Sequence, residues 1–79
     1  MKIEIITPKE NLYKGEANVV SFPGTEGSFE ILNNHSPIIS TLTQGEIMIV
    51  DTENNKHKFT IKSGLVEASN NIIWVLAEL

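Results

Sequence analysis

The side chains that could carry acid–base chemistry in this sequence are two histidines and the carboxylates near them. His35 follows a predicted turn and lies close along the chain to Glu26 and Glu30, a combination that can form an acid–base pair. A single histidine in a loop is more often a hydrogen-bonding structural residue. His57 falls in a strand-like alternation with apolar residues, so we expect it to pack as a structural side chain. We therefore predict no catalytic residue.

The stretch 24–27 contains two glycines but lacks the features of a phosphate-binding loop. It does not have the Gly-Lys-Ser/Thr sequence that contacts nucleotide phosphates, and Glu26 would repel an anion. The chain contains no cysteine, so neither a disulfide nor a thiolate metal site can form. No triad of metal-ligating side chains is visible. We expect no metal and no cofactor.

Composition restricts the class of protein further. The 79 residues predict a single domain over 1–79, small enough that we expect it to rely on a partner for part of its stability. A net charge of −4 and the absence of arginine argue against a nucleic-acid partner. The charged N-terminus is unlike a signal peptide, and no apolar run is long enough to insert into a membrane. These features indicate a soluble, cytoplasmic protein.

Period-two alternation of apolar and polar residues recurs along the chain, whereas a sustained helical period is absent. The segments with strand character are 2–7, 12–16, 18–22, 28–31, 38–42, 46–51, 56–62, 65–69 and 72–78. This pattern predicts an all-β fold, a flattened β-sandwich or barrel of roughly eight to ten short strands.

Turn-forming residues separate these segments. Pro23 and Gly24 suit positions i+1 and i+2 of a type II turn, and Gly27 then closes the bend. Gly15 indicates a bulge or a close approach of another group to the backbone. Asparagine tolerates positive φ, so further turns are expected at 33–34, 52–55 and 70–71.

The last strand is apolar on both sides. The residues on one side are Ile72, Trp74 and Leu76, and those on the other are Ile73, Val75 and Ala77. A small sandwich covers only one face of each sheet, so the second apolar side needs a cover. Two interpretations remain open: a closely curled barrel whose own loops cover the outer face, or a docking surface for a partner protein.

Several short motifs follow one another in a fixed order along essentially the whole chain. They are Leu12-Tyr13-x-Gly15, Gly24-x-x-Gly27 with Phe29-x-Ile31-Leu32, His35-Ser36-Pro37-Ile38-Ile39, Gly64-Leu65-Val66-Glu67 and Val75-Leu76-Ala77-Glu78. This order and spacing resembles the signature of the epsilon subunit of rotary ATP synthases, called delta in mitochondria.

The resemblance implies a non-catalytic subunit of a proton-translocating ATP synthase. Such a subunit belongs to the central stalk, links the gamma shaft to the membrane proteolipid ring, supports rotary coupling, and sits peripherally on the cytoplasmic side of the cell membrane. An alternative hypothesis is a free-standing β-sandwich that binds a small ligand or a peptide. Co-purification with a gamma-type subunit would discriminate between the two.

The resemblance also implies functional residues. The loops expected to face the proteolipid ring, together at one end of the sandwich, contain Glu26, Gly27, Ser28, Asn34, His35 and Ser36. Thr7 and Ser40 flank family motifs and are expected to contact gamma, because a surface around them would pack on that subunit.

Most members of the family continue into a two-helix C-terminal domain, whereas this sequence stops at Leu79. We therefore expect a short form without the helical hairpin. In relatives that hairpin can restrain ATP hydrolysis, and in some it binds ATP. Without the helices, and with no arginine to meet phosphates, we expect no ATP binding and no inhibition of hydrolysis.

Overall fold

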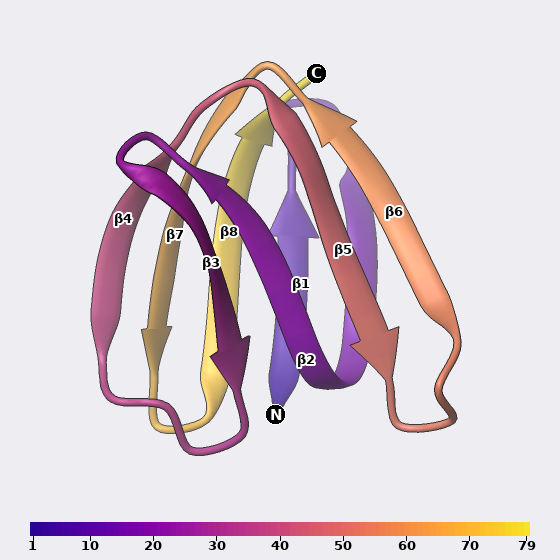
Figure 1. Ribbon diagram of the computed structural model, residues 1–79. Helices are drawn as coiled ribbons and strands as arrows, with labels where there is room; N and C mark the ends of the chain where they lie inside the picture. Colours follow the sequence, from indigo (N-terminus) through magenta and orange to yellow (C-terminus); the bar gives the residue numbers. More distant parts are fainter.

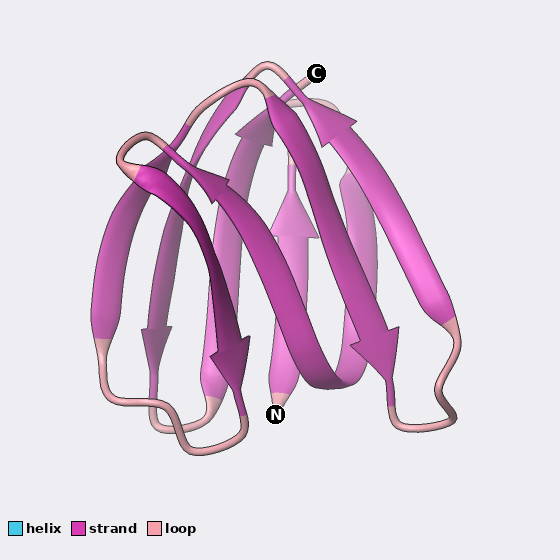
Figure 2. Cartoon of the chain, in the orientation of Figure 1, coloured by secondary structure: helices cyan, strands magenta, loops and turns pink.

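The computed structural model describes all residues, 1–79, as eight strands without a helix (Figures 1 and 2). The strands are β1 (Lys2–Ile6), β2 (Asn11–Gly24), β3 (Gly27–Leu32), β4 (Ile38–Leu42), β5 (Gly45–Asp51), β6 (Lys56–Ile61), β7 (Ser63–Ser69) and β8 (Ile72–Glu78). The predicted all-β fold with eight to ten short strands is confirmed. Nothing in the chain forms a helix that could cross a membrane.

The strands form two layers that share β2. The front sheet has the order β6-β5-β2-β3 and lies nearest the viewer in Figure 1. The back sheet has the order β4-β7-β8-β1-β2. All pairs are antiparallel except β1 with β8, which run in the same direction. The end of β2 also pairs with β4, through Gly24 and Leu42, so β2 joins the two layers at both edges of the back sheet.

Strand β2 corrects the expectation of two strands at 12–16 and 18–22. Its first half pairs with β1 and its second half with β3 and β5, and the pairing with β5 shifts between Ala17 and Val19. Ala17 is fully buried, and its small side chain lets the strand bend over the core. The bend is therefore at Ala17, whereas Gly15 stays in register opposite Ile3 and is not a bulge. Gly15 does permit a close approach, since a Cβ there would lie 3.2 Å from the Tyr13 hydroxyl.

The predicted type II turn at Pro23 and Gly24 is wrong. These residues continue the β2–β3 ladder, in which Gly24 pairs with Gly27, and only Thr25–Glu26 form the loop. Pro23 pairs with Ser28 in this ladder, and its carbonyl accepts a hydrogen bond of 2.8 Å from the backbone N–H of Thr43, which lies outside β3. Gly27 does close the bend, with a φ of 125°.

Gly24 is required by packing rather than by its backbone conformation. A Cβ at this position would lie 2.6 Å from the Gly27 carbonyl oxygen and 2.8 Å from Cε1 of Phe29. The Phe29 ring in turn stacks on Phe22, with ring centroids 5.4 Å apart. The glycine therefore makes space for an aromatic pair that closes this end of the sandwich.

The asparagine turns are confirmed. Asn34, Asn54, Asn70 and Asn71 all adopt positive φ, between 52° and 65°. Two consecutive positive φ values at Asn70 and Asn71 give the tight β7–β8 hairpin a backbone twist that matches its strands. Asparagine is the residue, after glycine, that adopts this conformation at least cost.

The core lies between the two sheets and consists of the inward side chains of every strand. Its buried apolar residues are Met1, Ile3, Ile5, Ala17, Val20, Phe22, Ile31, Leu42, Ile47, Ile49, Ile61, Val66, Ala68, Ile73, Val75 and Ala77. The alternation recognised in the sequence thus separates an inner face from an outer face on each strand.

Replacing Gly24 by alanine tests the packing at the end of β2. The added Cβ meets backbone and an aromatic ring, so Gly24→Ala should lower the free energy of unfolding by about 1–3 kcal/mol. Gly15→Ala is the matched control, because the contacting Tyr13 side chain can move aside. Urea denaturation of both variants measures the difference. Equal stability of the two would contradict the assigned contact.

Candidate interaction surface

The outer side of the back sheet exposes a group of large apolar side chains, which we call the apolar face. Its members are Ile6, Ile39, Leu65, Ile72, Trp74 and Leu76. Ile39 is 70% exposed, Leu76 56%, Trp74 41% and Leu65 40%. A contiguous apolar surface of this kind on a small domain typically marks an interaction site.

Strand pairing makes the apolar face continuous. Leu76 lies opposite Ile6 on one side and opposite Leu65 on the other, so three apolar side chains cross three strands in one row. In the next row Trp74 lies between Glu67 and Glu4. The prediction that the last strand is apolar on both sides is therefore confirmed. Its odd-numbered residues, Ile73, Val75 and Ala77, lie in the core, and its even-numbered residues, Ile72, Trp74 and Leu76, belong to the apolar face.

Two open hollows border the apolar face. The larger, of about 450 Å³, lies at the end of β1 and includes Thr7, Leu65 and Leu76 in its lining. The other, of about 370 Å³, lies beside Trp74 and is also lined by Lys14. No buried side-chain polar atom in the chain lacks a hydrogen-bond partner. The hollow beside Trp74 is lined by the charged side chains of Lys2, Glu4, Lys14 and Glu16, and both hollows are open. The face is therefore an open surface that another protein could cover, and it contains no closed ligand pocket.

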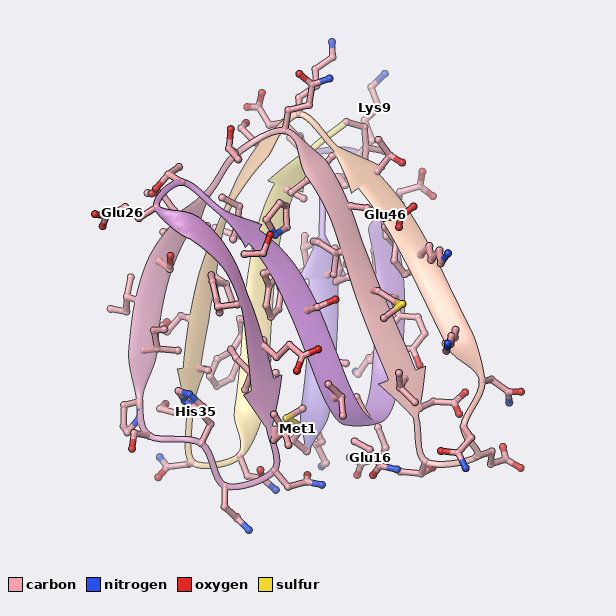
Figure 3. The ribbon with its side chains drawn as sticks, in the orientation of Figure 1. Met1, Lys9, Glu16, Glu26, His35 and Glu46 are labelled. Carbon is pink, nitrogen blue, oxygen red and sulfur yellow. The ribbon has the colours of Figure 1, made fainter.

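The two loops predicted to lie together are at opposite ends of the molecule (Figure 3). Strand β3 separates Glu26 from His35, and its six residues place them roughly 20 Å apart at ~3.3 Å per residue. The expected clustering at one end is therefore wrong, because the segment between the two turns is a fully extended strand. No acid–base pair forms either, since Nδ1 of His35 lies 2.7 Å from the carbonyl oxygen of Ser36.

The polar groups around Asn34, at one end of β3, are used within the chain. The backbone N–H of Asn34 donates to Oδ1 of Asn71 at 2.8 Å. The α-ammonium of Met1 donates to Oδ1 of Asn33 at 2.6 Å. Together with the local contact of His35, these bonds tie the β3–β4 loop to the β7–β8 hairpin and to the start of β1.

The hairpin at the other end of β3 leaves polar side chains free. Glu26 and Ser28 are exposed, and neither side chain makes a hydrogen bond or an ion pair. The loop itself is held firmly, because the Thr25 and Thr41 hydroxyls are 2.8 Å apart and the Thr25 N–H donates to the Thr41 carbonyl at 3.2 Å. A rigid loop with unpartnered polar groups can present them to another surface.

Thr7 and Ser40 differ in environment. Thr7 is 8% exposed, and its hydroxyl is 3.0 Å from the Glu10 carbonyl, which it bonds within the β1–β2 turn. It lies at the rim of the apolar face, beside Leu76. Ser40 pairs with the buried Val66, so its side chain points away from the apolar face, unlike that of its neighbour Ile39. Thr7 and Ser40 are also far apart on the sheet, because three strand spacings separate β1, which ends beside Thr7, from β4, which contains Ser40.

Several residues of this surface were missed by sequence reasoning. Ile6, Ile39 and Leu65 join Trp74 only because β1, β4 and β7 flank β8, and that order is set by long-range pairing. In 38–42 and 65–69 the outward positions are mixed, Ile39 with Thr41 and Leu65 with Glu67, so local alternation gave little signal for an apolar outer side. The strand order needed to combine those sides is absent from any local pattern.

His57 is a structural side chain, as predicted. Its Nε2 lies 2.9 Å from Oδ2 of Asp51, and its ring centroid is 5.0 Å from that of Tyr13. The Asp51 carboxylate also accepts hydrogen bonds from the backbone N–H groups of Glu53 and Asn55, at 2.8 and 2.9 Å. The bond from His57, followed by these backbone bonds, lowers the pKa of Asp51 from 3.8 to about 2. Burial, followed by the negative charge of Asp51, raises the pKa of Tyr13.

The Asp51 cluster closes the side of the sandwich where β6 meets the first half of β2. Tyr13 from β2 packs against His57 and also against Phe59, with ring centroids 5.9 Å apart in the second pair. Asp51 was not predicted from the sequence, although a turn-flanking aspartate six residues from an inward histidine was a usable signal. Nowhere does the chain gather three or more side chains that could hold a metal ion.

Comparison with known proteins gives a consistent result. The family model for the ATP synthase delta/epsilon chain, β-sandwich domain, matches residues 1–79. The ATP synthase epsilon chains of Helicobacter pylori (strain P12) and of Leptospira interrogans serovar copenhageni are 37% and 38% identical to this chain over 78 residues. Both alignments include 99% of this chain, but only 63% and 61% of those relatives. The chain thus spans about three-fifths of the length of these curated relatives.

Solved structures contain the same fold. A chain in the cryo-EM structure of the Tetrahymena thermophila mitochondrial ATP synthase central stalk and c-ring aligns with a TM-score of 0.83 and 18% identity, over 100% of this chain and 63% of that one. A chain of the Euglena gracilis mitochondrial ATP synthase aligns with a TM-score of 0.88 and 16% identity, over 95% and 48%. At these identities the likeness concerns the fold alone.

The lowered pKa of Asp51 makes stability depend on acidity. A carboxylate whose pKa is lower in the folded state stabilises the fold when it is ionised. Its contribution to the free energy of unfolding is complete above pH 3.8, the ordinary pKa, and is lost as the pH falls towards about 2. Asp51→Asn should therefore flatten the decline of the unfolding free energy over that interval. Thermal denaturation against pH measures it, with the exposed Glu53→Gln as the control. Parallel profiles for Asp51→Asn and the wild type would contradict the role of this contact.

Proposed function

Since this chain belongs to the ATP synthase delta/epsilon family, a non-catalytic subunit, and corresponds to its β-sandwich domain, we propose that it serves in the central stalk of the enzyme. There it links the gamma shaft to the membrane proteolipid ring and supports rotary coupling of proton flow, on the cytoplasmic side of the membrane. The observation that supports this proposal most strongly is the exposed apolar face on a domain of this family.

The apolar face is the surface that we assign to gamma. A large fraction of Ile39, Trp74 and Leu76 remains in water in the isolated chain, and covering such side chains stabilises a complex by roughly 25 cal/mol per Å² of apolar area. Thr7 lies at the rim of this face, and β4 with Ser40 forms its opposite edge. Since Ser40 points to the other side of β4, Ile39 is the residue of that strand that would enter the contact.

The Thr25–Glu26 hairpin is the part that we assign to the proteolipid ring. Glu26 and Ser28 have no side-chain partner within the chain, whereas in the β3–β4 loop the Asn33 side chain, the Asn34 backbone N–H and the His35 ring make internal hydrogen bonds. Both loops cannot contact one ring through the same end of the molecule. We therefore keep Glu26, Gly27 and Ser28 as the ring-facing residues and place Asn34–Ser36 at the distal end.

Loss of the central aromatic side chain should weaken assembly with gamma. Large aromatic residues in the middle of an interface often contribute most of its affinity, so Trp74→Ala should lower the affinity for gamma by roughly tenfold or more. Trp74 is outward, so the isolated domain should keep its β-sheet circular dichroism. Titration calorimetry with purified gamma measures the affinity.

The matched control is Met48→Ala, which truncates an outward apolar side chain at the centre of the front sheet. This variant should bind gamma as the wild type does. If Met48→Ala weakened binding and Trp74→Ala did not, the interface would lie on the front sheet and the assignment to the apolar face would be wrong.

Cross-linking tests the assignment of the ring-facing end. The chain has no cysteine, so Ser28→Cys and His35→Cys each provide a single attachment point for a photoreactive maleimide. In the assembled enzyme, illumination should join the Ser28→Cys chain to a proteolipid subunit and leave the His35→Cys chain unattached to the ring. Ring products from the His35→Cys chain alone would reverse the orientation.

A further inference from the structure

Glu67 is an exposed carboxylate within the apolar face. It lies opposite Ile39 on β4 and opposite Trp74 on β8, and Leu65 precedes it by two positions on the same side of β7. It belongs to none of the ion pairs in the chain. Three exposed apolar side chains, those of Ile39, Leu65 and Trp74, therefore surround a negative charge without an internal partner.

The other carboxylate of this row has a different environment. Glu4 lies on the far side of Trp74, and its Oε2 is 3.9 Å from Nζ of Lys14 on β2. A cation from the chain itself thus accompanies Glu4 when the surface is covered. Glu67 has no such companion, because its neighbours in the row on β4 and β8 are apolar.

Covering the apolar face would remove water from Glu67. The transfer of an unpaired carboxylate out of water is strongly unfavourable and would offset much of the gain from burying the apolar side chains around it. A charge-assisted hydrogen bond to a guanidinium or an ammonium group removes that penalty. The surface that docks here must therefore bring a cation to Glu67.

A second copy of this chain does not meet that requirement. If two apolar faces pack through Trp74 about a two-fold axis parallel to the strands, Glu67 of one copy faces Glu4 of the other. If the axis is perpendicular to the strands, Glu67 faces its own equivalent. Both arrangements place carboxylates opposite each other in a desolvated contact, and in the first the single lysine beside each contact, Lys14, already pairs with Glu4. Neither gives Glu67 a cation of its own.

We propose that Glu67 is the residue that selects and aligns the partner on the apolar face, by pairing with an arginine or lysine that the partner places among apolar groups. The proposal rests on the proposed function, in which this partner is gamma. It adds the chemistry of the matching surface: an apolar patch with one positive charge at its centre, opposite β7. Glu67 sets the register of the contact, and the surrounding apolar residues supply most of its buried area.

Charge-changing variants of Glu67 test the proposal. Removal of one partner from a buried charge pair leaves the other unpaired, so Glu67→Gln should weaken gamma binding by roughly 30-fold or more. Glu67→Lys should weaken it further. The affinity of the wild type should fall as salt concentration rises, and that of Glu67→Gln should depend less on salt. Reversal of the gamma arginine or lysine that faces β7 should restore binding to Glu67→Lys.

The matched controls are Glu30→Gln and Glu30→Lys, which make the same changes at an exposed position on the front sheet. Both should bind gamma like the wild type. If Glu67→Gln binds within about threefold of the wild type while Trp74→Ala is weakened, the apolar face is the interface and the cation is absent. If Trp74→Ala also binds normally, the proposed gamma surface itself is wrong.

Discussion

The fold depends on the way β2 serves both sheets. Its first half pairs with β1 in the back sheet, and its second half pairs with β3 and β5 in the front sheet. The bend at the buried Ala17 brings the inward side chains of the two halves into one core. With an interior of this size, most inward positions are apolar, and the inward His57 is paired with Asp51. The outer sides are free to differ. That of the back sheet carries the large apolar side chains of Ile39, Trp74 and Leu76, whereas that of the front sheet carries Glu30, Lys56 and Lys58 beside the smaller apolar group of Met48 and Leu32.

This division of faces connects the fold to its proposed role. A small domain gains limited stability from its own core, so a second apolar surface gives it a way to be stabilised by assembly. The apolar face lies on the open outer side of a sheet and contains no closed pocket, which suits a protein partner. Apolar groups alone would fix the orientation of a docked partner poorly. A charge pair with Glu67, within that face, would fix how the partner is aligned. At one end of the sandwich, a firmly held hairpin presents Glu26 away from the core.

Local chemistry predicted much of this structure. The asparagines at 70 and 71 predicted a turn with positive φ, which the β7–β8 hairpin contains. The apolar alternation around His57 predicted that this histidine packs as a structural side chain. The turn predicted at Pro23 was wrong. The strand tolerates a residue without an N–H at this position, where the Pro23 carbonyl still accepts a hydrogen bond from Thr43. The parallel pairing of β1 with β8 and the separation of Glu26 from His35 depend on long-range register. Short sequence patterns do not contain that information.

The most direct test of the central claim uses the single tryptophan of the chain. Trp74 lies at the centre of the apolar face and is 41% exposed, so its fluorescence reports whether that face is covered. The chain labelled with 5-hydroxytryptophan can be observed selectively when gamma is added. If gamma covers the apolar face, emission moves to shorter wavelength and acrylamide quenching falls as the complex forms. A complex that forms while both signals stay unchanged would contradict the assignment of the apolar face to gamma.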